Sequence, residues 1–225
     1  MKLLLCGGGC GKKTIEANRI FNKIIDHTKP LLYVPLAMDE NEHPYDSCFE
    51  WITGELSSVD IPRIEMVRTF EELASKNLSN YCAIFIGGGN TYKLLKGIKE
   101  SGAFNKIKEY IDNDGILYGG SAGAIICGYD INSVLPMDDN DVNLKDTKGF
   151  NVLNGISLFA HYTNEETPEL HEKYKKYLLD YSLSNEQVIA LPEEDTIFIN
   201  NGEFTILGTR PYYKFINGIE NKIDK

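Results

Sequence analysis

Short apolar runs alternate with longer amphipathic stretches over the first half of the chain. Several of the runs contain no polar residue, which is typical of strands buried on both faces of a parallel sheet. The predicted strands are Leu3–Cys6, Leu31–Pro35, Ile64–Val67, Ala83–Ile86 and Ile116–Tyr118. Helices are predicted between them over Thr14–Asp26, Asp46–Leu56, Phe70–Ser75, Thr91–Ile98 and Ala103–Asp112. This alternation predicts an α/β fold with a doubly wound, mostly parallel sheet flanked by helices.

The pattern changes after Gly128. Residues 129–155 are rich in Asp, Asn and Gly without a sustained period, which predicts a long loop interrupted by short elements. A helix is predicted over Pro168–Ser184, and closely spaced strands follow at Val188–Leu191, Thr196–Asn200, Glu203–Leu207 and Tyr212–Ile216. The turn Asn200–Gly202 is a strong hairpin signal, so we expect a C-terminal β-hairpin region. The sequence contains no internal repeat or linker, and residues 1–225 are expected to form a single domain.

Composition narrows the possible partners and the compartment. Lys and Arg total 23 against 33 Asp and Glu, and a net charge of −10 argues against a nucleic-acid binder, which needs a basic face. The five cysteines stand mostly in apolar surroundings, as reduced and buried thiols do. The run Leu3–Cys6 is too short for a signal-peptide core, and no stretch approaches the ~20 apolar residues that span a membrane. We therefore expect a cytoplasmic protein without membrane or nucleic-acid partners.

The glycine-rich segment Gly7–Thr14 does not match a nucleotide-binding loop. The phosphate-binding pattern G-x-x-x-x-G-K-[ST] needs a glycine where Cys6 stands and a Ser or Thr where Lys13 stands. The dinucleotide pattern G-x-G-x-x-G needs a glycine where Lys12 stands. We interpret the turn as one that lets the backbone approach a neighbouring loop or a substrate, and we predict no cofactor.

A serine lies at the turn that follows the strand Ile116–Tyr118. The segment LYGGSAGAIICG places Ser121 between Gly119 and Gly123, in the G-x-S-x-G pattern of a nucleophile elbow. The residues that flank the serine in such a turn must be very small, and the hydroxyl projects above the sheet. Ser121 is therefore a candidate nucleophile. The alternative is a glycine-rich strand-to-helix turn with an incidental serine.

A second glycine turn, Gly87–Asn90, follows an earlier predicted strand and opens a helix. The carboxyl ends of parallel strands share one edge of a sheet, so this turn is expected beside Ser121. Backbone N–H groups at a helix N-terminus can stabilise negative charge on a carbonyl oxygen. The predicted oxyanion hole combines the N–H of Ala122 with that of Gly88 or Gly89. The alternative is that the glycines only permit a tight turn.

Four histidines are available as a general base for the serine. His161 stands where the apolar run Leu158–Ala160 gives way to a polar loop, a position in which α/β enzymes place catalytic groups. His27, His43 and His171 stand in segments that are expected at the surface. His161 is therefore the candidate base, and a structural histidine is the alternative.

An acid that orients the imidazole is expected at the end of another strand. Two groups qualify: Glu193, Glu194 and Asp195 after a predicted strand, and Asp138, Asp139 and Asp141 in the long loop. The loop acids are also compatible with solvated charges or a weak divalent-cation site. No spacing of His, Cys, Asp and Glu is specific enough to predict a metal.

Together these motifs resemble peptidase family S51, which includes the α-aspartyl dipeptidases (peptidase E) and, more distantly, cyanophycinase. Four segments in the same order carry the resemblance: AIFIGGGNTYKLL at 83–95, GGSAGA at 119–124, HYTN at 161–164 and LPE at 191–193. The resemblance implies a class I glutamine amidotransferase-like, flavodoxin-like α/β fold. In that fold, serine replaces the cysteine of the amidotransferase elbow.

The resemblance also implies roles for individual residues. Ser121 is then the nucleophile, His161 the general base and Glu193 the acid that orients the base. The family has an aspartate of the loop after the elbow assigned to its site, and Asp138 or Asp139 could correspond to it. The implied activity is serine-type hydrolysis of short peptides, as in a dipeptidase, by a monomer or homodimer without cofactor or metal.

The substrate is less well specified. Aspartyl dipeptidases of the family carry an arginine in the helix after the histidine, suited to an acidic residue by bidentate pairing. The comparable stretch here, His171–Lys176, contains lysines and no arginine, and Arg63 and Arg210 stand elsewhere in the sequence. Cleavage of Asp-X dipeptides is therefore left open. Two alternatives remain: a non-catalytic binding module of the same fold, and an amidotransferase-like hydrolase of another amide, for which Cys127 is the nearby thiol.

Overall fold

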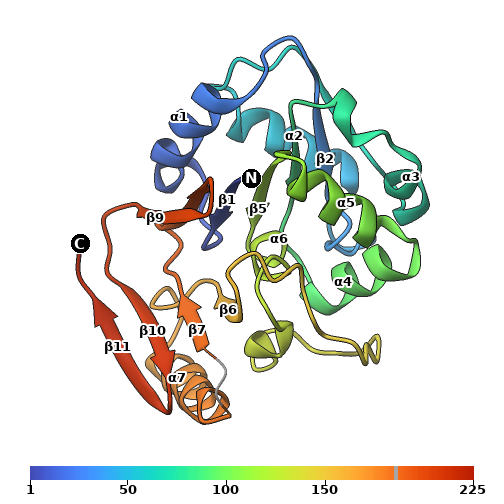
Figure 1. The fold of residues 1–225 in the computed structure, drawn as a ribbon. Coiled ribbons are helices and arrows are strands. Elements are labelled where there is room, and N and C mark those ends of the chain that lie inside the picture. The colour runs from blue at the N-terminus through green and yellow to red at the C-terminus, as the bar shows by residue number, and fades with distance from the viewer. Residues whose placement is uncertain (185–186) are drawn as a thin grey trace.

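The apolar runs of the first half form five neighbouring parallel strands. The structure, a computed structural model, describes residues 1–184 and 187–225. The strands are β1 (Lys2–Cys6), β2 (Leu31–Val34), β3 (Ile64–Met66), β4 (Ala83–Ile86) and β5 (Ile116–Gly120). They lie in the order β3-β2-β4-β5-β1. Of these strands, β2, β5 and β1 are labelled in Figure 1. Each predicted strand is present, with ends that differ by at most two residues.

Helices cover both faces of this sheet. Leu3 and Leu5 of β1 belong to one apolar cluster, whereas Leu4 and Cys6 belong to another, because successive side chains of a strand point to opposite faces. The helices are α1 (Ile15–Ile24), α2 (Tyr45–Glu55), α3 (Phe70–Ser75), α4 (Thr91–Glu100), α5 (Ala103–Asp112) and α6 (Ala122–Ile125). Residues of α1 and α2 pack in the second cluster and residues of α3, α4 and α5 in the first. The predicted doubly wound α/β architecture is confirmed.

The predicted C-terminal hairpin extends the same sheet. β8 (Thr196–Asn200) and β9 (Glu203–Leu207) pair antiparallel, and β8 also pairs antiparallel with β1. Asn201 and Gly202 at the turn both have positive φ, 53° and 87°, which is the backbone that a two-residue hairpin turn requires. The full sheet therefore has seven strands, in the order β3-β2-β4-β5-β1-β8-β9.

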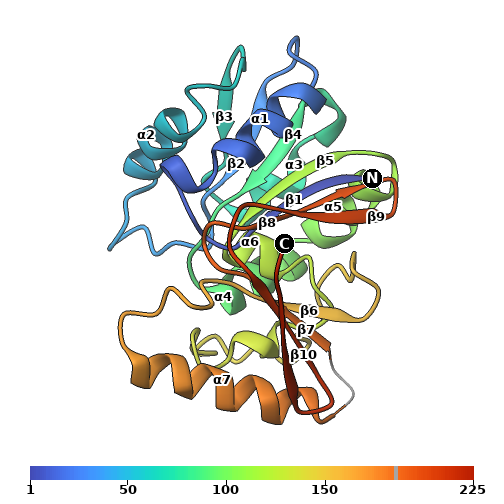
Figure 2. The ribbon, with the colours of Figure 1, turned by 90° about the vertical axis from the view of Figure 1, so that its left-hand side faces the viewer.

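A second sheet was not part of the sequence prediction. The strands β6 (Ile156–Phe159), β7 (Gln187–Ala190), β10 (Tyr212–Ile216) and β11 (Ile219–Ile223) pair in the order β11-β10-β7-β6. The helix α7 (Pro168–Ser182) packs on this sheet, at the end of the molecule away from α2 in Figure 2. The strand β11 was missed because Glu, Asn and Lys fill its centre and leave almost no apolar signal.

The long segment between the elbow and β6 is a loop, as predicted. Residues 129–155 contain a 3-10 turn at Ile131–Val134 and otherwise no regular helix or strand. Across residues 1–184 and 187–225, every helix is too short or too polar to cross a lipid bilayer.

Three glycine-containing turns meet at the carboxyl edge of the parallel strands. Gly7–Gly9 follows β1, Gly87–Gly89 follows β4, and Ser121 follows β5. The second sheet reaches this edge too, because the N–H of His161, two residues beyond β6, donates a hydrogen bond of 2.9 Å to the carbonyl of Gly7. The two sheets therefore bring their carboxyl-end turns to one place.

Candidate active site

The turn at Ser121 has the backbone of a tight elbow. Ser121 has φ 49° and ψ −111°, a conformation that L-residues rarely adopt, and its N–H donates to the carbonyl of Cys6 at 3.1 Å. A Cβ placed on Gly119 would lie 2.4 Å from the carbonyl oxygen of Gly123, and one placed on Gly123 would lie 2.1 Å from that of Ile86. The small residues of the pattern are therefore required by close backbone packing around the serine.

His161 connects the serine to an acid. Its Nε2 lies 2.9 Å from Ser121 Oγ, and its Nδ1 lies 2.9 Å from Glu193 Oε1. The pairing of β6 with β7 accounts for this arrangement, because the two parallel strands end side by side and lead into His161 and Glu193. The three residues, from three separate segments, form one hydrogen-bonded chain. Its geometry matches that of a nucleophile, a base and an orienting acid.

Glu193 is held by partners that sequence reasoning missed. Lys13 donates to its Oε2, and the side-chain oxygen of Asn164 accepts from its backbone N–H at 2.9 Å. Burial acts to raise the pKa of Glu193, but hydrogen bonds from Lys13 and His161 outweigh burial and hold that pKa below its usual range. The signal in the sequence was a lysine two residues after the last glycine of the segment Gly7–Gly11, at the edge where acids are expected.

The turn Gly7–Gly9 supports the histidine and the acid from behind. A Cβ on Gly8, whose φ is 107°, would lie 2.1 Å from the imidazole of His161. Cβ atoms on Gly7 and Gly9 would lie 2.2 Å from the carbonyl oxygens of Pro192 and Glu193, respectively. The interpretation of this turn as a close approach of backbone to a neighbouring loop is confirmed.

The residues predicted for the oxyanion hole surround the serine. A Cβ built on Gly88 would lie 3.3 Å from Ser121 Cβ, so the turn after β4 is in contact with the elbow. Ala122 is the first residue of α6, and a first helical N–H has no acceptor within its own helix. Gly89 has φ 128°, and a Cβ there would lie 2.4 Å from the carbonyl of Ala37. Gly88 is thus beside the hydroxyl, whereas Gly89 packs on the loop after β2.

This fold and site can be compared with known proteins. A sequence model of peptidase family S51 matches residues 3–207, nearly the whole chain. The chain belongs to peptidase family S51. It is accordingly a serine-type peptidase, and the alternative of a non-catalytic binding module is set aside.

Individual known proteins are similar to this S51 peptidase in sequence or in fold. Peptidase E of Escherichia coli (strain K12 / DH10B) is 26% identical over 208 residues, which cover 80% of this chain and 88% of that protein. A proposed peptidase E protein from Listeria monocytogenes EGD-e has the same fold, with a TM-score of 0.72, 24% identity and coverage of 92% and 98% of the two chains. A peptidase from an acI-B1 Actinobacterium superimposes with a TM-score of 0.73 at 18% identity, over 99% and 93%.

The loop acids of the S51 peptidase have other partners. Asp138 Oδ2 accepts from the N–H of Thr91 at the start of α4 (2.8 Å), and the backbone carbonyl of Asp139 accepts from Asn90 (2.9 Å). Burial raises the pKa of Asp138. Among the residues described, His161 has no hydrogen bond to either aspartate. The geometry therefore favours Glu193 as the acid beside the histidine.

Two lysines of α7 bind partners other than the serine, histidine and glutamate of the site. Lys173 donates to the carbonyl of Pro136 at 3.2 Å, and Lys175 forms an ion pair with Glu220 at 2.5 Å. Arg210, which the sequence places far from the histidine, lies close to it in space: its guanidinium donates to Thr163 Oγ1 at 2.9 Å and to Glu194 at 3.3 Å. Only the pairing of elements could reveal this neighbour.

The thiol alternative does not fit the structure. Cys127 is fully buried, its Sγ faces the carbonyl of Gly123 at 3.4 Å, and burial raises its pKa far above the usual range. A buried neutral thiol is inert as a nucleophile. Cys10 is exposed, and the four other cysteines are buried, all five without disulfide partners.

The remaining histidines differ in their surroundings. His27 is exposed, as expected, and its Nδ1 lies 2.6 Å from the carbonyl of Asp60. His43 is also exposed but lies at the rim of a cavity that includes Ser121. His171 is only half-buried, 3.1 Å from Glu165, with its ring against that of Tyr162.

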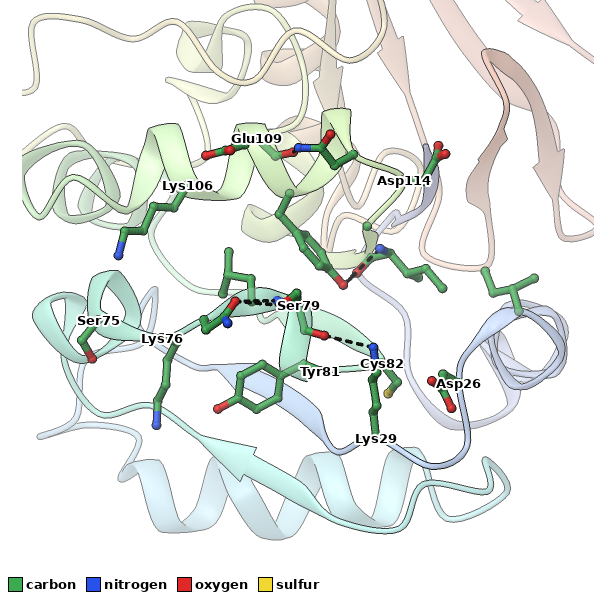
Figure 3. A pocket seen from close by; sticks show the side chains of 17 residues that line it. Asp26, Lys29, Ser75, Lys76, Ser79, Tyr81, Cys82, Lys106, Glu109 and Asp114 are labelled. Carbon is green, nitrogen blue, oxygen red and sulfur yellow. Dashed lines mark hydrogen bonds between the residues drawn. The ribbon is translucent and has the colours of Figure 1, made fainter.

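Two cavities lie at opposite ends of the parallel sheet. The carboxyl-end cavity, about 530 Å³, is lined by Ser121, His161, Gly88 and Gly89 together with residues of β2, β4, β5 and α2. The amino-end cavity, about 700 Å³, is lined by residues that precede β2, β4 and β5 and contains none of the predicted site residues. Figure 3 shows its lysines and carboxylates spread around the opening. The smaller cavity is therefore the candidate active site.

Proposed function

We propose that this S51 peptidase hydrolyses short peptides, as a dipeptidase does, with Ser121 as nucleophile, His161 as general base and Glu193 as the residue that orients His161. The observation that carries the proposal is the chain of two 2.9 Å hydrogen bonds that joins these residues at the edge of a cavity. A cavity of about 530 Å³ accommodates a small ligand rather than a folded chain, since ligand sites commonly measure about 300–1,000 Å³.

The reaction follows from the positions of the groups. Ser121 Oγ attacks the scissile carbonyl carbon while His161 Nε2 takes the hydroxyl proton. The N–H of Ala122 and that of Gly88 or Gly89 hold the negative oxygen. His161 returns the proton to the leaving amine as the C–N bond breaks, which leaves an acyl-serine. Water then gives a proton to His161 and attacks the acyl carbon, and His161 reprotonates Ser121 as the ester bond breaks.

Each group has an expected share of the rate. General acid–base catalysis contributes about 10²–10⁴-fold, and one oxyanion donor about 10²–10³-fold. Glu193 stabilises the imidazolium that forms during attack, and Lys13 keeps Glu193 charged for that purpose.

The decisive experiment is a dipeptide library assayed with wild type and Ser121→Ala. We expect Ser121→Ala to lower kcat/KM by at least about 10⁴-fold without changing the thermal unfolding midpoint. Ser58→Ala, an exposed serine outside the cavity, is the matched control and should keep full activity. A fluorophosphonate probe should label wild type and fail to label Ser121→Ala. Equal cleavage by wild type and Ser121→Ala, or no cleavage by either, would refute the proposal.

A further inference from the structure

Part of the wall of the carboxyl-end cavity is aromatic. Tyr33 of β2, Phe85 of β4 and Tyr118 of β5 come from adjacent strands, and Trp51 of α2 faces them. Ring centroids lie 5.9 Å apart for Tyr33 and Phe85, 4.7 Å for Phe85 and Tyr118, and 6.3 Å for Trp51 and Phe85. Trp51 keeps 43% of its surface exposed, which is unusual for so large an apolar side chain. Tyr33, Phe85 and Tyr118 are nearly fully buried, so the contact surface for another flat apolar group is mainly the Trp51 ring.

The charges on the cavity wall are negative. Glu42 and Glu55 line it, and no lysine or arginine does among the residues that the structure describes. Glu55 is fixed in place, because Thr14 and Asn18 donate to its Oε1 and the N–H of Gly11 donates to its Oε2 at 2.8 Å. An acidic substrate side chain in this cavity would meet like charges and lose its hydration without a partner.

Three cationic side chains in segments near the cavity already bind other groups of the protein. Lys13 is paired with Glu193, and Lys93 donates to the carbonyl of Met38. Arg210 is held by Thr163 and Glu194. None of these three side chains lines the cavity. An acidic residue would have to pull one of them away from a partner in order to be neutralised.

The hydroxyl of Tyr33 is a polar group of this cavity wall. The side chain of Tyr33 is 97% buried, since its relative exposure is 3%. Its hydroxyl has no hydrogen-bond partner among the described residues, and a Cβ on Gly87 would lie 3.4 Å from that oxygen. This oxygen is not among the fully buried polar atoms that lack a partner, so it stays open to the cavity and can pair with a ligand group.

We propose that the carboxyl-end cavity selects peptides with an aromatic residue next to the scissile bond, and that it disfavours acidic residues there. This inference rests on the proposed peptidase function. The aromatic ring would stack against Trp51 and Phe85, and a substrate phenol or backbone group would pair with the Tyr33 hydroxyl. An acidic preference would require a cation on the wall, and a basic preference would require Glu42 or Glu55 to act as the partner.

The test compares two dipeptide series, X-Ala and Ala-X, with X as Phe, Tyr, Leu, Lys or Asp. At one of the two positions, we expect kcat/KM for Phe and Tyr to exceed the values for Asp and Lys by at least about tenfold. If Asp or Lys is the preferred residue at the more selective position, or if neither position discriminates, the specificity proposal is wrong. Ser121→Ala assayed in parallel shows whether the peptidase proposal still holds in that case.

Substitutions in the wall give an independent readout. Trp51→Ala should lower the Phe-to-Asp ratio of kcat/KM by about tenfold, because a stacking surface is lost. Phe204→Ala removes another partly exposed aromatic side chain, on β9 outside the cavity, and should leave the ratio unchanged. Glu42→Arg places a cation at the rim and should shift the ratio toward Asp. Glu50→Arg makes the same charge change on α2 outside this cavity and is its control. An unchanged ratio in both Trp51→Ala and Glu42→Arg would overturn the proposal.

A binding measurement separates the two proposals if wild type cleaves nothing. Ser121→Ala titrated with Phe-Ala, Ala-Phe, Asp-Ala and Ala-Asp by calorimetry reports recognition without turnover. Tighter binding of an aromatic dipeptide would support the specificity while the peptidase function fails. Absence of binding by all four, or tighter binding of an acidic dipeptide, would refute the specificity.

Discussion

The two ends of the parallel sheet both carry a cavity, but they differ in how the backbone and charges are arranged. The amino-end cavity is larger, about 700 Å³ against 530 Å³. Two of its lysines bind backbone carbonyls: Lys29 donates to Ser79 at 3.0 Å, as Figure 3 shows, and Lys106 donates to Ala74. The third, Lys76, pairs with Glu72 at 3.1 Å. The carboxyl-end cavity instead holds a hydrogen-bonded serine, histidine and glutamate. Cavity size alone would therefore have indicated the wrong end.

Backbone strain shows the same contrast. Ser121 and His161 both have positive φ, 49° and 59°, and Gly8 and Gly89 beside them have φ of 107° and 128°. At the amino-end cavity, Asp114 in a turn is the corresponding non-glycine case. Unfavourable backbone conformations persist where the surrounding structure imposes them, and they concentrate at functional sites. The comparison teaches that strained turns, rather than volume, distinguish the end at which we propose the chemistry.

The largest loss of activity in this comparison of the two ends is expected when Glu193, the acid at the carboxyl end, is substituted. Glu193→Gln keeps the shape but cannot stabilise an imidazolium, so we expect kcat to fall by about 10³–10⁴-fold. Asp138→Asn is the matched control, because the new amide oxygen can still accept from the N–H of Thr91. It should cost far less activity. Steady-state kinetics on one dipeptide decides between them, and an equal loss in both variants would assign the orienting role to the loop.

Activity should be nearly as sensitive to a substitution in the turn Gly7–Gly9, which packs against His161. In Gly8→Ala, the new Cβ would overlap the imidazole of His161, so the ring has to move away from Ser121. The alanine would also have to adopt the positive φ of Gly8, which is unfavourable for an L-residue. We expect a loss of about 10²-fold or more in kcat/KM, the size of lost general base catalysis. Gly11→Ala is a useful comparison, since its Cβ would meet nothing within 4 Å and its φ of 59° is also positive. Comparable activities for the two variants would contradict the packing argument.

Lys13 should have a smaller effect that depends on pH. The lowered pKa of Glu193 means that its charge stabilises the site above the ordinary glutamate pKa, and that this stabilisation is lost as pH falls through the lowered value. Lys13→Met removes one of the hydrogen bonds that lower the pKa of Glu193, so that pKa rises. The acid limb of the kcat/KM profile should therefore move to higher pH, with a loss of about tenfold at the acidic end.

The control for Lys13 is Lys12→Met, which removes the same charge one residue away. Lys12 is exposed and has no recorded contact with Glu193. Its pH profile should follow that of wild type. A uniform loss across all pH values in Lys13→Met would show a structural role instead of control over the charge of Glu193.

The smallest effect is expected at the amino end. Lys106→Ala removes an exposed lysine that binds the carbonyl of Ala74, far from Ser121 along the strands. The kcat/KM of this variant should equal that of wild type, and the free energy of unfolding should change by less than about 0.5 kcal/mol. A loss of activity would show that the larger cavity contributes to function and would remove the contrast between the two ends.

Much of the fold was readable from local patterns. Strands and helices of the first half appear within a few residues of their predicted limits, because continuous apolar runs and helical spacing record burial directly. The second sheet was not readable. Its strand β11 is polar at the centre, and β6, β7 and β10 give no sign in the sequence of which sheet they join. We retain the prediction of a single domain, since one apolar cluster contains Leu5 of the large sheet and Ile189 of the small one.

By itself, the sequence determined the chemical groups and their places at strand ends: a serine between glycines, a histidine after an apolar run and a glutamate after a proline. These are local properties, set by turn geometry and burial over a few residues. Only the tertiary structure decided which acid faces the histidine, that Lys13 and Arg210 lie beside this site, and that the cavity wall is aromatic and acidic. Such neighbours come from strands that are separate in the sequence, such as β6 with β7 and β1 with β5 or β8, and pairing depends on packing of the whole chain rather than on any one segment.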